Sequence, residues 1–350
     1  MSNPVLRVGL VGYGTGGSIF HAPLIRCCKR MQISGVLTSK EIPQRVRSFD
    51  ELIARSELIV IASPNLTHFP FAKQALQAER HVVVDKPFTV TLDEADELIA
   101  LAKQHKRSLS VFHNRRWDSD FLTVRQLIAQ LGDVMLFEAN WDRFRPAIKQ
   151  GWREVAEPGS GLLNDLGPHM IDQALQLFGM PQAVEADIIA QRPSAVVDDY
   201  FDIRLHYGRS RILLRSSTLV TAPRPRFAVF GSAGSFVKYG LDPQEAQLKA
   251  GLKPGDSGFG IDQSDGTLTF ADGRIETAPS KIGNYLAFYE AIADAILDGT
   301  PVPVAPEDAR DGLALIDLAR RAAEQGLRLA VSESNPTASS REPEPPGSYS

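Results

Sequence analysis

The stretch LRVGLVGYGTGG, residues 6–17, decides the fold, because its two halves predict a short buried strand and a glycine-rich turn. The residues that follow, SIFHAPLIRCC, carry apolar side chains at helical spacing. Gly12, Gly14 and Gly17 thus form G-x-G-x-x-G, with Thr15 inside it. In this motif the first glycine permits a tight turn, the second lets a pyrophosphate approach the backbone, and the third lets helix and strand pack closely. The helix N-terminus adds N–H groups and partial positive charge. We predict a dinucleotide site, against the alternative of a turn with no ligand.

Strand-like and helical runs alternate from this turn to about Arg116. The strand-like runs are 33–39, 57–63, 81–85 and 108–113, and the helical runs are 48–56, 68–79 and 91–106. Two of the helices begin with a capping-box pattern, Ser48 with Glu51 and Thr91 with Glu94. This alternation predicts βαβ units and a doubly wound parallel sheet, an α/β fold.

The pattern changes after a predicted helix at residues 120–131. Strand-like runs then follow one another directly, at 133–144, 182–192, 199–208, 211–220 and 226–240, and two helical runs follow at 285–297 and 307–325. This predicts an α+β domain with an open, mostly antiparallel sheet. We therefore expect an NAD(P)-binding domain at 1–118, a substrate-binding and oligomerisation domain at 119–330, and a polar, proline-rich, disordered tail at 331–350.

Composition excludes several classes of function. The chain has 350 residues and a formal net charge of -4, which favours neither nucleic acid nor an anionic membrane surface as a partner. Its two cysteines, Cys27 and Cys28, are adjacent, rarely bridge in that arrangement, and cannot form a cysteine-rich metal site, so we expect no metal. No run of 18 apolar residues and no apolar leader occurs, so we expect a cytoplasmic protein.

The end of the second strand bears on the choice between NAD and NADP. NAD sites usually place an acid there to hold the ribose 2′-OH. Here Thr38, Ser39 and Lys40 follow the strand, and the first acid is Glu41. Two hydroxyls and an ammonium attract a 2′-phosphate, so we predict NADP. The alternative is that Lys40 is a solvated surface charge and that NAD is also accepted.

The sequence HVVVDKPFTV, residues 81–90, ends a buried strand on Asp85, Lys86 and Pro87 instead of a usual turn. Ligands bind beyond the carboxyl ends of strands in an open parallel sheet. A lysine there can hydrogen-bond a substrate hydroxyl and counter its developing negative charge. Proline removes a donor and permits a cis bond. The alternative is a surface lysine after a strand.

A second candidate lies in LLNDLGPHMIDQAL, residues 162–175. Gly167-Pro168 resembles a helix start, which places His169 in the first turn, where the positive helix end disfavours imidazolium. Asp165 then precedes the helix and can orient the ring. The alternative is a structural histidine on an apolar helix.

Three clusters are less specific. The cluster SPNLTH, residues 63–68, lies on the expected ligand edge. The other two combine arginine with aromatic residues, which suits either polyol recognition or domain packing. The three clusters contain Ser63, Pro64, Asn65 and His68; His113, Asn114, Arg115, Arg116 and Trp117; and Trp141, Arg143, Arg145, Trp152 and Arg153.

Seven segments together resemble the glucose–fructose oxidoreductase and inositol dehydrogenase family, Gfo/Idh/MocA, over about residues 5–325. They are VGYGTGGSIFHAPLI, SPNLTHFPFAKQAL, HVVVDKPFTVT, SVFHNRRWDSDFLT, DRFRP, NDLGPHMIDQALQLFGMP and VKYGLDPQE. Within the family the chain looks most like bacterial NADP-dependent scyllo-inositol dehydrogenases. The segment between the second and third strands is shorter than is usual in the family.

The resemblance implies a Rossmann domain followed by an α+β domain, and assembly as a homodimer or homotetramer. It implies an active-site lysine, Lys86, with a cis bond to Pro87, after an acid that is Asp85 here and more commonly glutamate. It also implies His169 as general acid/base with Asp165 assisting. Other matched positions line the cofactor or substrate pocket in relatives; they are Asn65, His68, Arg116, Trp152 and Arg153. We also expect Asn114 to contact the substrate.

The sequence therefore predicts an oxidoreductase that moves hydride between a secondary alcohol of a cyclic polyol or sugar and NADP, with His169 and Lys86 acting on the hydroxyl. One alternative is a sugar dehydrogenase or an aldehyde or ketone reductase with the same residues. Another class is a non-catalytic NAD(P)-binding regulator, which has no need of the lysine and the histidine.

Overall fold

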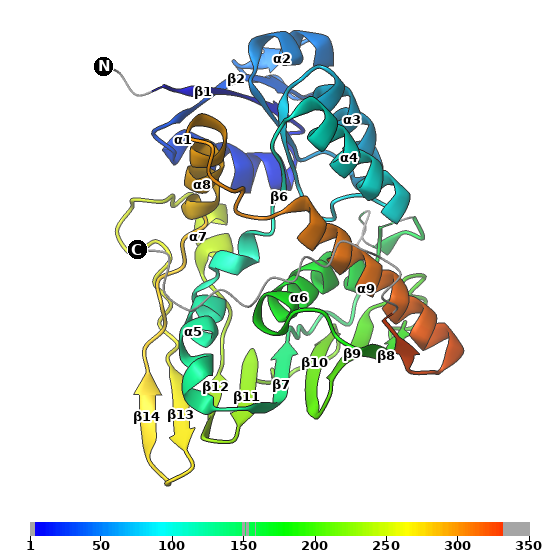
Figure 1. Cartoon of the computed structure of the whole chain (residues 1–350), viewed down its shortest axis with the longest axis vertical. Coiled ribbons are helices and arrows are strands. Elements are labelled where there is room, and N and C mark those ends of the chain that lie inside the picture. The colour runs from blue at the N-terminus through cyan, green and yellow to red at the C-terminus, as the bar shows by residue number, and fades with distance from the viewer. Residues whose placement is uncertain (1–3, 149–150, 152–153, 158, 332–350) are drawn as a thin grey trace. The chain divides into compact units, whose positions relative to one another are not determined.

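The computed structural model describes residues 4–148, 151, 154–157 and 159–331, and it divides into two compact units. Of the described residues, the first unit contains those up to Asp118 together with Pro243–Gly260 and Gly283–Asp311. The second unit contains those of Ser119–Asp242 and Ile261–Ile282, and those from Gly312 to Val331 (Figure 1). The sequence-based division cut the chain once, at residue 118. Two later segments in fact pack with the first unit. The predicted disordered tail, residues 331–350, begins one residue too early, because the Val331 N–H donates to the Gln182 carbonyl at 2.9 Å and its side chain packs on the second core. The rest of the predicted tail lies outside the described residues.

A parallel sheet of six strands forms the centre of the first unit. The strands are β1 (Leu6–Val11), β2 (Met31–Leu37), β3 (Arg45–Val46), β4 (Leu58–Ile61), β5 (His81–Val84) and β6 (Leu109–Val111). Their order is β3-β2-β1-β4-β5-β6, which is the order of a dinucleotide-binding sheet. All neighbouring pairs run parallel, so the carboxyl ends of the strands share one edge. The predicted doubly wound sheet is confirmed.

Helices cover this sheet on both faces. They are α1 (Ala22–Cys27), α2 (Phe49–Arg55), α3 (His68–Gln77), α4 (Leu92–His105) and, from a later segment, α8 (Leu286–Leu297). The other later segment contains α7 (Gln244–Lys249), which contacts residues Gly16–His21. Figure 1 shows α3 beside α4, and α8 beside α1. The capping box at the start of α4 is confirmed, because Thr91 accepts from the Glu94 N–H and Glu94 accepts from the Thr91 N–H.

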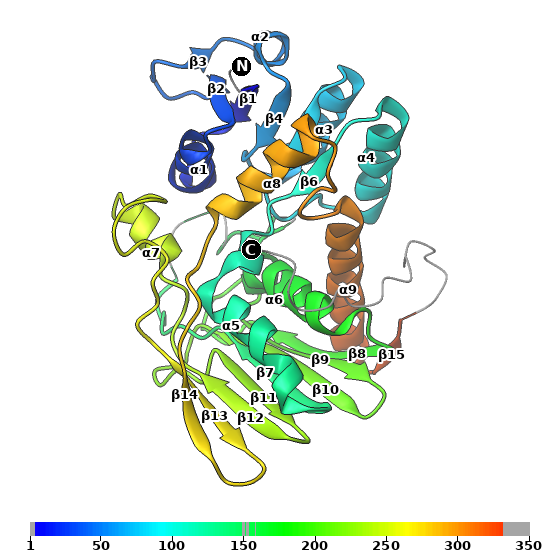
Figure 2. The same ribbon diagram turned by 60° about the vertical axis from the view of Figure 1, so that its left-hand side comes forward.

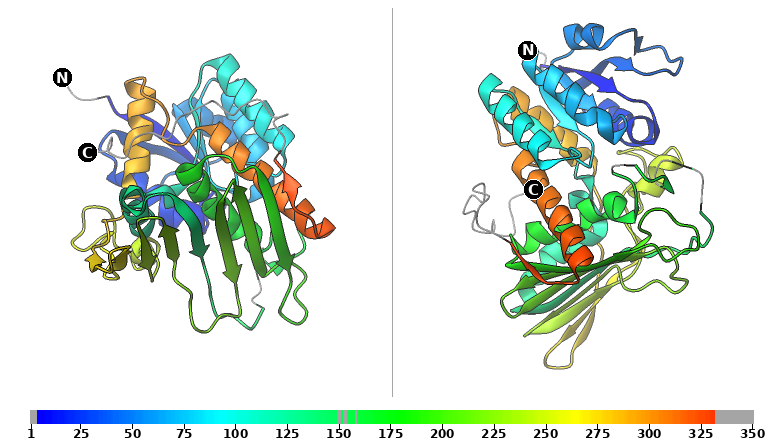
Figure 3. Two further views of the ribbon diagram at one scale, coloured as in Figure 1. Left: turned by 60° about the horizontal axis from the view of Figure 1, so that its bottom comes forward. Right: turned by 90° about the vertical axis from the view of Figure 1, so that its right-hand side faces the viewer.

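The second unit is built on a nine-stranded sheet. Its strands are β7 (Val134–Asn140), β8 (Ala183–Ile189), β9 (Tyr200–Tyr207), β10 (Ser210–Ser217), β11 (Phe227–Gly231), β12 (Gly234–Lys238), β13 (Gly266–Phe270), β14 (Ile275–Ala278) and β15 (Leu329–Ala330). The order is β14-β13-β12-β11-β7-β10-β9-β8-β15. The neighbours β7 and β10 run parallel and the other pairs antiparallel, as predicted. Figure 3 shows the sheet from two sides.

The helices of the second unit lie on one face of this sheet. They are α5 (Ser119–Leu127), α6 (Leu162–Phe178) and α9 (Pro306–Gln325), of which the residues up to Asp311 belong to the first unit. Figure 2 shows α5 and α6 over the strands, and α6 packs on β9 and β10. The predicted helix at 120–131 ends earlier, because residues 128–131 form a 3₁₀ turn. In the described part of the chain, no helix has the length and apolarity needed to span a membrane.

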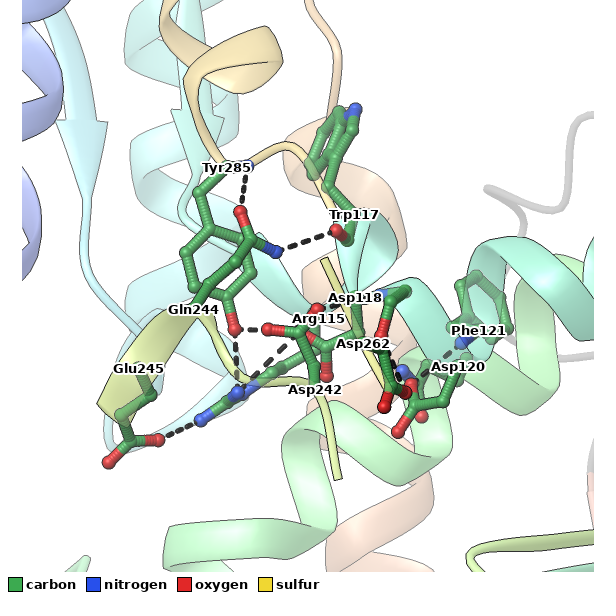
Figure 4. Close-up of polar contacts among 12 residues, drawn as sticks. Arg115, Trp117, Asp118, Asp120, Phe121, Asp242, Gln244, Glu245, Asp262 and Tyr285 are labelled. Carbon is green, nitrogen blue, oxygen red and sulfur yellow. Dashed lines mark hydrogen bonds and ion pairs between the residues drawn. The ribbon is translucent and has the colours of Figure 1, made fainter. Parts of the chain in front are cut away.

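A buried ion pair ties the end of β12 to the start of α5. The Lys238 ammonium is fully buried and lies 2.8 Å from the Asp262 carboxylate and 2.8 Å from the Tyr239 carbonyl. Asp262 also accepts from the Ser119 hydroxyl at 3.2 Å, and Asp242 accepts the Ser119 N–H at 2.7 Å. Figure 4 shows both carboxylates at the start of α5. The position of α5 thus depends on charged groups held out of water.

Removing the carboxylate of this pair should destabilise the protein more than removing the ammonium. Asp262→Ala leaves the buried ammonium beside the Tyr239 carbonyl without its counter-ion, and we expect a loss of roughly 3–5 kcal/mol in the free energy of unfolding. Lys238→Met costs less, because the carboxylate keeps Ser119 and the Ser264 N–H, which it accepts at 2.9 Å. Denaturant unfolding followed by circular dichroism compares the two variants, and equal losses contradict this account.

Candidate functional site

The glycine-rich turn after β1 shows why three of its positions lack a side chain. Gly12 has φ +91°, and a Cβ there would lie 2.4 Å from the Ala62 carbonyl oxygen. A Cβ on Gly17 would lie 2.2 Å from the Gly12 carbonyl oxygen. Both glycines are therefore required by the fold. A Cβ on Gly14 meets nothing within 4 Å. The free space above Gly14 fits the approach of a pyrophosphate to the backbone, which is the role predicted for it.

The helix after this turn starts in an unusual form. Residues Gly16–His21 make a π-helical turn that leads into α1, and such turns occur frequently at functional sites. The backbone N–H and the hydroxyl of Ser18 both donate to the Gly14 carbonyl, at 2.9 and 2.7 Å. Thr15 precedes the turn with helical backbone angles. The turn and the helix start are thus one hydrogen-bonded unit that can hold a phosphate.

The predicted cofactor-selecting residues follow β2. The Lys40 N–H donates to the Thr38 hydroxyl at 3.1 Å, and the side chains of Ser39 and Lys40 are exposed. The next acid, Glu41, pairs with Arg45 of β3. The charge of Glu41 is therefore offset by a guanidinium, and the end of β2 presents hydroxyls and an ammonium.

His68, at the start of α3, joins the loops that follow β4 and β5. Its Nδ1 lies 2.8 Å from the Pro87 carbonyl oxygen and its Nε2 lies 3.0 Å from the Ser63 carbonyl oxygen. The ring is buried, while Pro64 is exposed and Asn65 half-buried. Both nitrogens of His68 thus face backbone carbonyls, and the single N–H of a neutral ring donates to one of the two. Direct cofactor contact by His68, Pro64 or Asn65 stays a prediction.

The Asp85-Lys86-Pro87 turn follows β5 at the carboxyl edge, and the Lys86–Pro87 bond is cis, as the resemblance implied. Asp85 Oδ1 accepts the Lys86 N–H at 2.8 Å, and Asp85 Oδ2 lies 3.5 Å from His21 Nε2. Burial raises the pKa of Asp85, but its hydrogen bond and charge interaction with His21, with smaller effects of Lys86 and His68, outweigh burial and leave the pKa below its ordinary value. The motif thus presents a half-buried lysine beside a carboxylate that stays ionised.

The segment after β6 holds buried arginines within the first unit. Arg116 pairs with Asp308 at 3.0 Å and donates to the Pro303 carbonyl at 3.4 Å, and its predicted role in binding stays a prediction. Arg115 donates to the Tyr285 hydroxyl at 2.6 Å and pairs with Glu245 (Figure 4). Burial raises the pKa of Glu245, but the charges of Arg115 and Lys249 lower it to about 2. Asn114 is buried beside them.

The second candidate helix, α6, begins earlier than predicted. It starts at Leu162 after Gly161, so Pro168 lies inside it, and the predicted start at Gly167-Pro168 is wrong. The reason is Asp198, whose side chain accepts the Leu163 N–H at 2.6 Å and whose carbonyl accepts the Leu162 N–H at 2.8 Å. The argument that the positive helix end keeps His169 neutral therefore fails, because His169 lies past the first turn.

Asp165 and His169 stand one helical turn apart on α6, at the spacing that places side chains on one face. His169 is 5% exposed, and its ring centroid lies 6.5 Å from that of Trp141. Asp165 Oδ2 lies 3.7 Å from Arg143 Nη1. The predicted pair is thus placed together, though not before a helix start. Trp152 and Arg153 lie outside the described residues.

Sequence reasoning missed a buried arginine beside this helix. Arg226 donates to Gln173 at 2.8 Å, lies 3.3 Å from Asp120, and stacks over the Trp141 ring at 4.8 Å. Gln173 follows His169 by one turn of α6. The sequence offered one signal for it, because Arg226 is a charged residue at the start of the strand-like run 226–240. Arg226 fixes two neighbours of the candidate histidine.

These features define a class: a dinucleotide-binding unit with a lysine at the carboxyl edge of its sheet, and a second unit with a buried histidine on a helix. Residues 6–113 match the family described as "Oxidoreductase family, NAD-binding Rossmann fold", and residues 125–331 match "Oxidoreductase family, C-terminal alpha/beta domain". The chain belongs to the Gfo/Idh/MocA oxidoreductase family, which confirms the resemblance. It is an NAD(P)-binding oxidoreductase.

Individual relatives cover nearly the whole chain. The uncharacterized oxidoreductase YdgJ of Escherichia coli is 45% identical over 93% of this chain and 99% of its own length. The scyllo-inositol 2-dehydrogenase (NADP(+)) IolW of Bacillus subtilis is 38% identical over 91% of this chain and 94% of its own. The solved structure of yvaA from Bacillus subtilis superposes with a TM-score of 0.91 at 37% identity, covering 95% of this chain and 100% of that one.

Substitutions of Gly14 and Gly17 should distinguish a glycine needed for ligand binding from one needed for folding. Gly14→Val places a side chain in open space, so the melting temperature stays near that of the wild type while NADPH affinity falls at least about tenfold. Gly17→Ala forces a Cβ onto the Gly12 carbonyl and lowers the melting temperature instead. Fluorescence titration and thermal denaturation measure both, and unchanged binding by Gly14→Val counts against a phosphate at this turn.

Proposed function

We propose that the chain catalyses the reversible oxidation of a secondary alcohol on a cyclic polyol or sugar with NADP(H). The observation that carries this proposal is the lysine turn at the carboxyl edge of the parallel sheet, in a chain 38% identical to a relative named for scyllo-inositol oxidation with NADP(+). The substrate of that relative is a cyclic polyol, and a sugar offers the same secondary alcohol. Fold alone does not choose between them.

Lys86 positions and polarises the substrate hydroxyl in this proposal. Its ammonium donates a hydrogen bond to the oxygen and stabilises negative charge that develops as the O–H proton leaves. Asp85 beneath it stays ionised and accepts the Lys86 N–H, which fixes the backbone from which the side chain extends. A bound nicotinamide supplies the hydride chemistry. The contribution of the turn is orientation and charge.

His169 takes the hydroxyl proton in the direction of alcohol oxidation and returns it in the reverse direction. A buried imidazole suits this role, because its ordinary pKa lies near neutrality. Asp165, one turn earlier, is proposed to orient the ring, and Arg143 near Asp165 favours the ionised carboxylate. This role of His169 depends on its position beside Asp165 on one face of α6, and it does not require His169 to be at the start of the helix.

The catalytic residues are tested by single substitutions. At saturating NADP, His169→Ala should lower kcat by on the order of 10²–10⁴, since that is the usual contribution of a positioned base. Lys86→Ala should lower kcat through lost charge stabilisation. Lys103→Ala, which removes a surface lysine paired with Glu307 at 2.9 Å, is the matched control and should change kcat little. Near wild-type turnover in both site variants refutes the assigned roles.

The cofactor preference is tested at the end of β2. Lys40→Ala should lower kcat/KM for NADP by several-fold and leave kcat/KM for NAD nearly unchanged, because only the 2′-phosphate attracts the ammonium. The exposed position of Lys40 limits the effect by solvent screening. Steady-state kinetics with both cofactors measures it. A clear wild-type preference for NAD overturns the choice of NADP.

The substrate class is tested by an absorbance screen at the nicotinamide wavelength. The panel contains inositol isomers, aldoses and ketoses, each with NADP and with NAD. Turnover of a cyclic polyol or sugar supports the proposal, and turnover of simple aldehydes or ketones alone favours the reductase alternative. Tight NADPH binding with no turnover on the whole panel favours a nucleotide-sensing regulator.

A further inference from the structure

A fully buried histidine links the lysine turn to a helix from the later part of the chain. His21, in the π-helical turn, is 0% exposed. Its Nδ1 lies 2.5 Å from the Tyr289 hydroxyl on α8, and its Nε2 lies 3.5 Å from Asp85 Oδ2. The Phe112 ring packs against the imidazole with centroids 4.3 Å apart. All four residues belong to the first unit.

The chemistry of the three polar groups fixes where the protons lie. Burial, followed by the charges of Asp85 and Cys28, raises the pKa of Tyr289 well above its ordinary value, so the phenol keeps its proton. The ionised carboxylate of Asp85 can only accept. The consistent arrangement has Tyr289 donating to Nδ1 and the Nε2–H of His21 directed at Asp85.

The Asp85 carboxylate, 3.5 Å from His21 Nε2, also has contacts with the backbone around it. Asp85 Oδ1 accepts the Lys86 N–H at 2.8 Å. A Cβ on Gly16 would lie 2.8 Å from Asp85 Oδ2, so the glycine-rich turn lies directly against the carboxylate. His68 Nδ1 lies 2.8 Å from the Pro87 carbonyl oxygen. Asp85 and Pro87, on either side of Lys86, therefore each lie beside an imidazole nitrogen.

We propose that His21 and Tyr289 are positioning residues for the lysine turn: Tyr289 sets the tautomer of His21, and His21 donates to Asp85 and so fixes the backbone of Lys86. The role of Lys86 in this statement rests on the proposed function. The 3.5 Å separation is longer than an optimal hydrogen bond. Such contacts commonly shorten when ligands complete a site, and we expect that here on NADPH binding.

The first experiment needs no substrate. Histidine-selective ¹⁵N labelling of the full chain, with and without NADPH, reports which ring nitrogen of His21 carries the proton, and His21→Gln assigns the signal. We expect the proton on Nε2, and a loss of this single tautomer in Tyr289→Phe. A proton on Nδ1 with Nε2 bare overturns the proposal. Because no turnover is measured, this result stands whether or not the proposed reaction is correct.

Two substitutions of His21 test the donor itself. His21→Gln places an amide N–H near the position of Nε2, whereas His21→Asn places its amide near Nδ1 and leaves Asp85 without a donor. Misplaced catalytic groups cost on the order of 10² in rate, so we expect that loss of kcat in the asparagine variant and partial rescue in the glutamine variant, with little change in the KM for NADP. Wild-type kcat in the asparagine variant contradicts the proposal.

The pH profile distinguishes this role from general stability. His21, Lys86 and His68 face Asp85 and lower its pKa against the effect of burial, and the neutral Tyr289 hydroxyl lies beyond His21. Without the His21 donor, the pKa of Asp85 rises, so a smaller fraction is ionised at a given acidic pH. The acidic limb of kcat/KM should therefore move to higher pH in His21→Asn. ¹³C titration of aspartate carboxyls follows the same change without substrate.

A matched tyrosine provides the control. Tyr285, one helical turn before Tyr289, is equally buried, and its hydroxyl contacts Arg115 at 2.6 Å and Asp118 at 2.7 Å. Tyr285→Phe and Tyr289→Phe each lose one buried hydroxyl and should lose similar melting temperature. Only Tyr289→Phe should change the His21 spectrum and the acidic limb. If Tyr285→Phe changes the His21 spectrum and the acidic limb as much as Tyr289→Phe does, then Tyr289 contributes only to packing and the proposal is wrong.

Discussion

The first unit depends on the contact of backbone with backbone at the glycine-rich turn. Gly12 reaches φ +91° and touches the end of β4, and Gly17 packs on the Gly12 carbonyl. These contacts place the helical turn Gly16–His21 close to the carboxyl ends of β1 and β4. The open face of Gly14 and the reach of His21 to Asp85 both follow from that placement. A side chain at Gly12 or Gly17 would displace this helical turn, and with it His21.

The polar groups beneath the lysine turn are held at an energetic cost. An imidazole moved out of water without partners loses roughly 1–3 kcal/mol of hydrogen-bond energy. The His21 ring packs against the rings of Phe112 and Tyr289, and Phe112 in turn packs against Phe288. Tyr289 and Asp85 offset the cost only when all three groups are aligned. This requirement favours a single geometry of the turn. A single geometry is what Lys86 needs if it is to hydrogen-bond a substrate hydroxyl.

Local pattern predicted the parts of the fold that local forces determine. Hydrophobic periodicity indicated the strands of the parallel sheet, and Thr91 with Glu94 indicated the start of α4. The start of α6 was misjudged, because Gly167-Pro168 is a strong local signal while the true cap, Asp198, lies some 35 residues away in the chain. The return of α7 and α8 to the first unit depends on distant packing that no short window contains.

The candidate site divides in the same way. The glycines and Lys86 belong to motifs whose chemistry is visible in sequence, and the structure places them at one edge of one sheet. His21 was invisible, because a histidine on an apolar helix has no signature until its neighbours are known. Its partner Tyr289 lies 268 residues further along the chain. The expected homodimer or homotetramer stays a prediction for the same reason, since assembly depends on surfaces and not on motifs.

The choice of aspartate at position 85 follows from these neighbours. One carboxylate oxygen is committed to the Lys86 N–H, and the other lies against Gly16 and toward His21. A glutamate carries its carboxylate one methylene further, into space that the glycine-rich turn occupies, unless the side chain turns away from His21. The short acid, the glycine at position 16 and the buried histidine are therefore mutually dependent. Changing one of the three alters what the other two can do for the lysine.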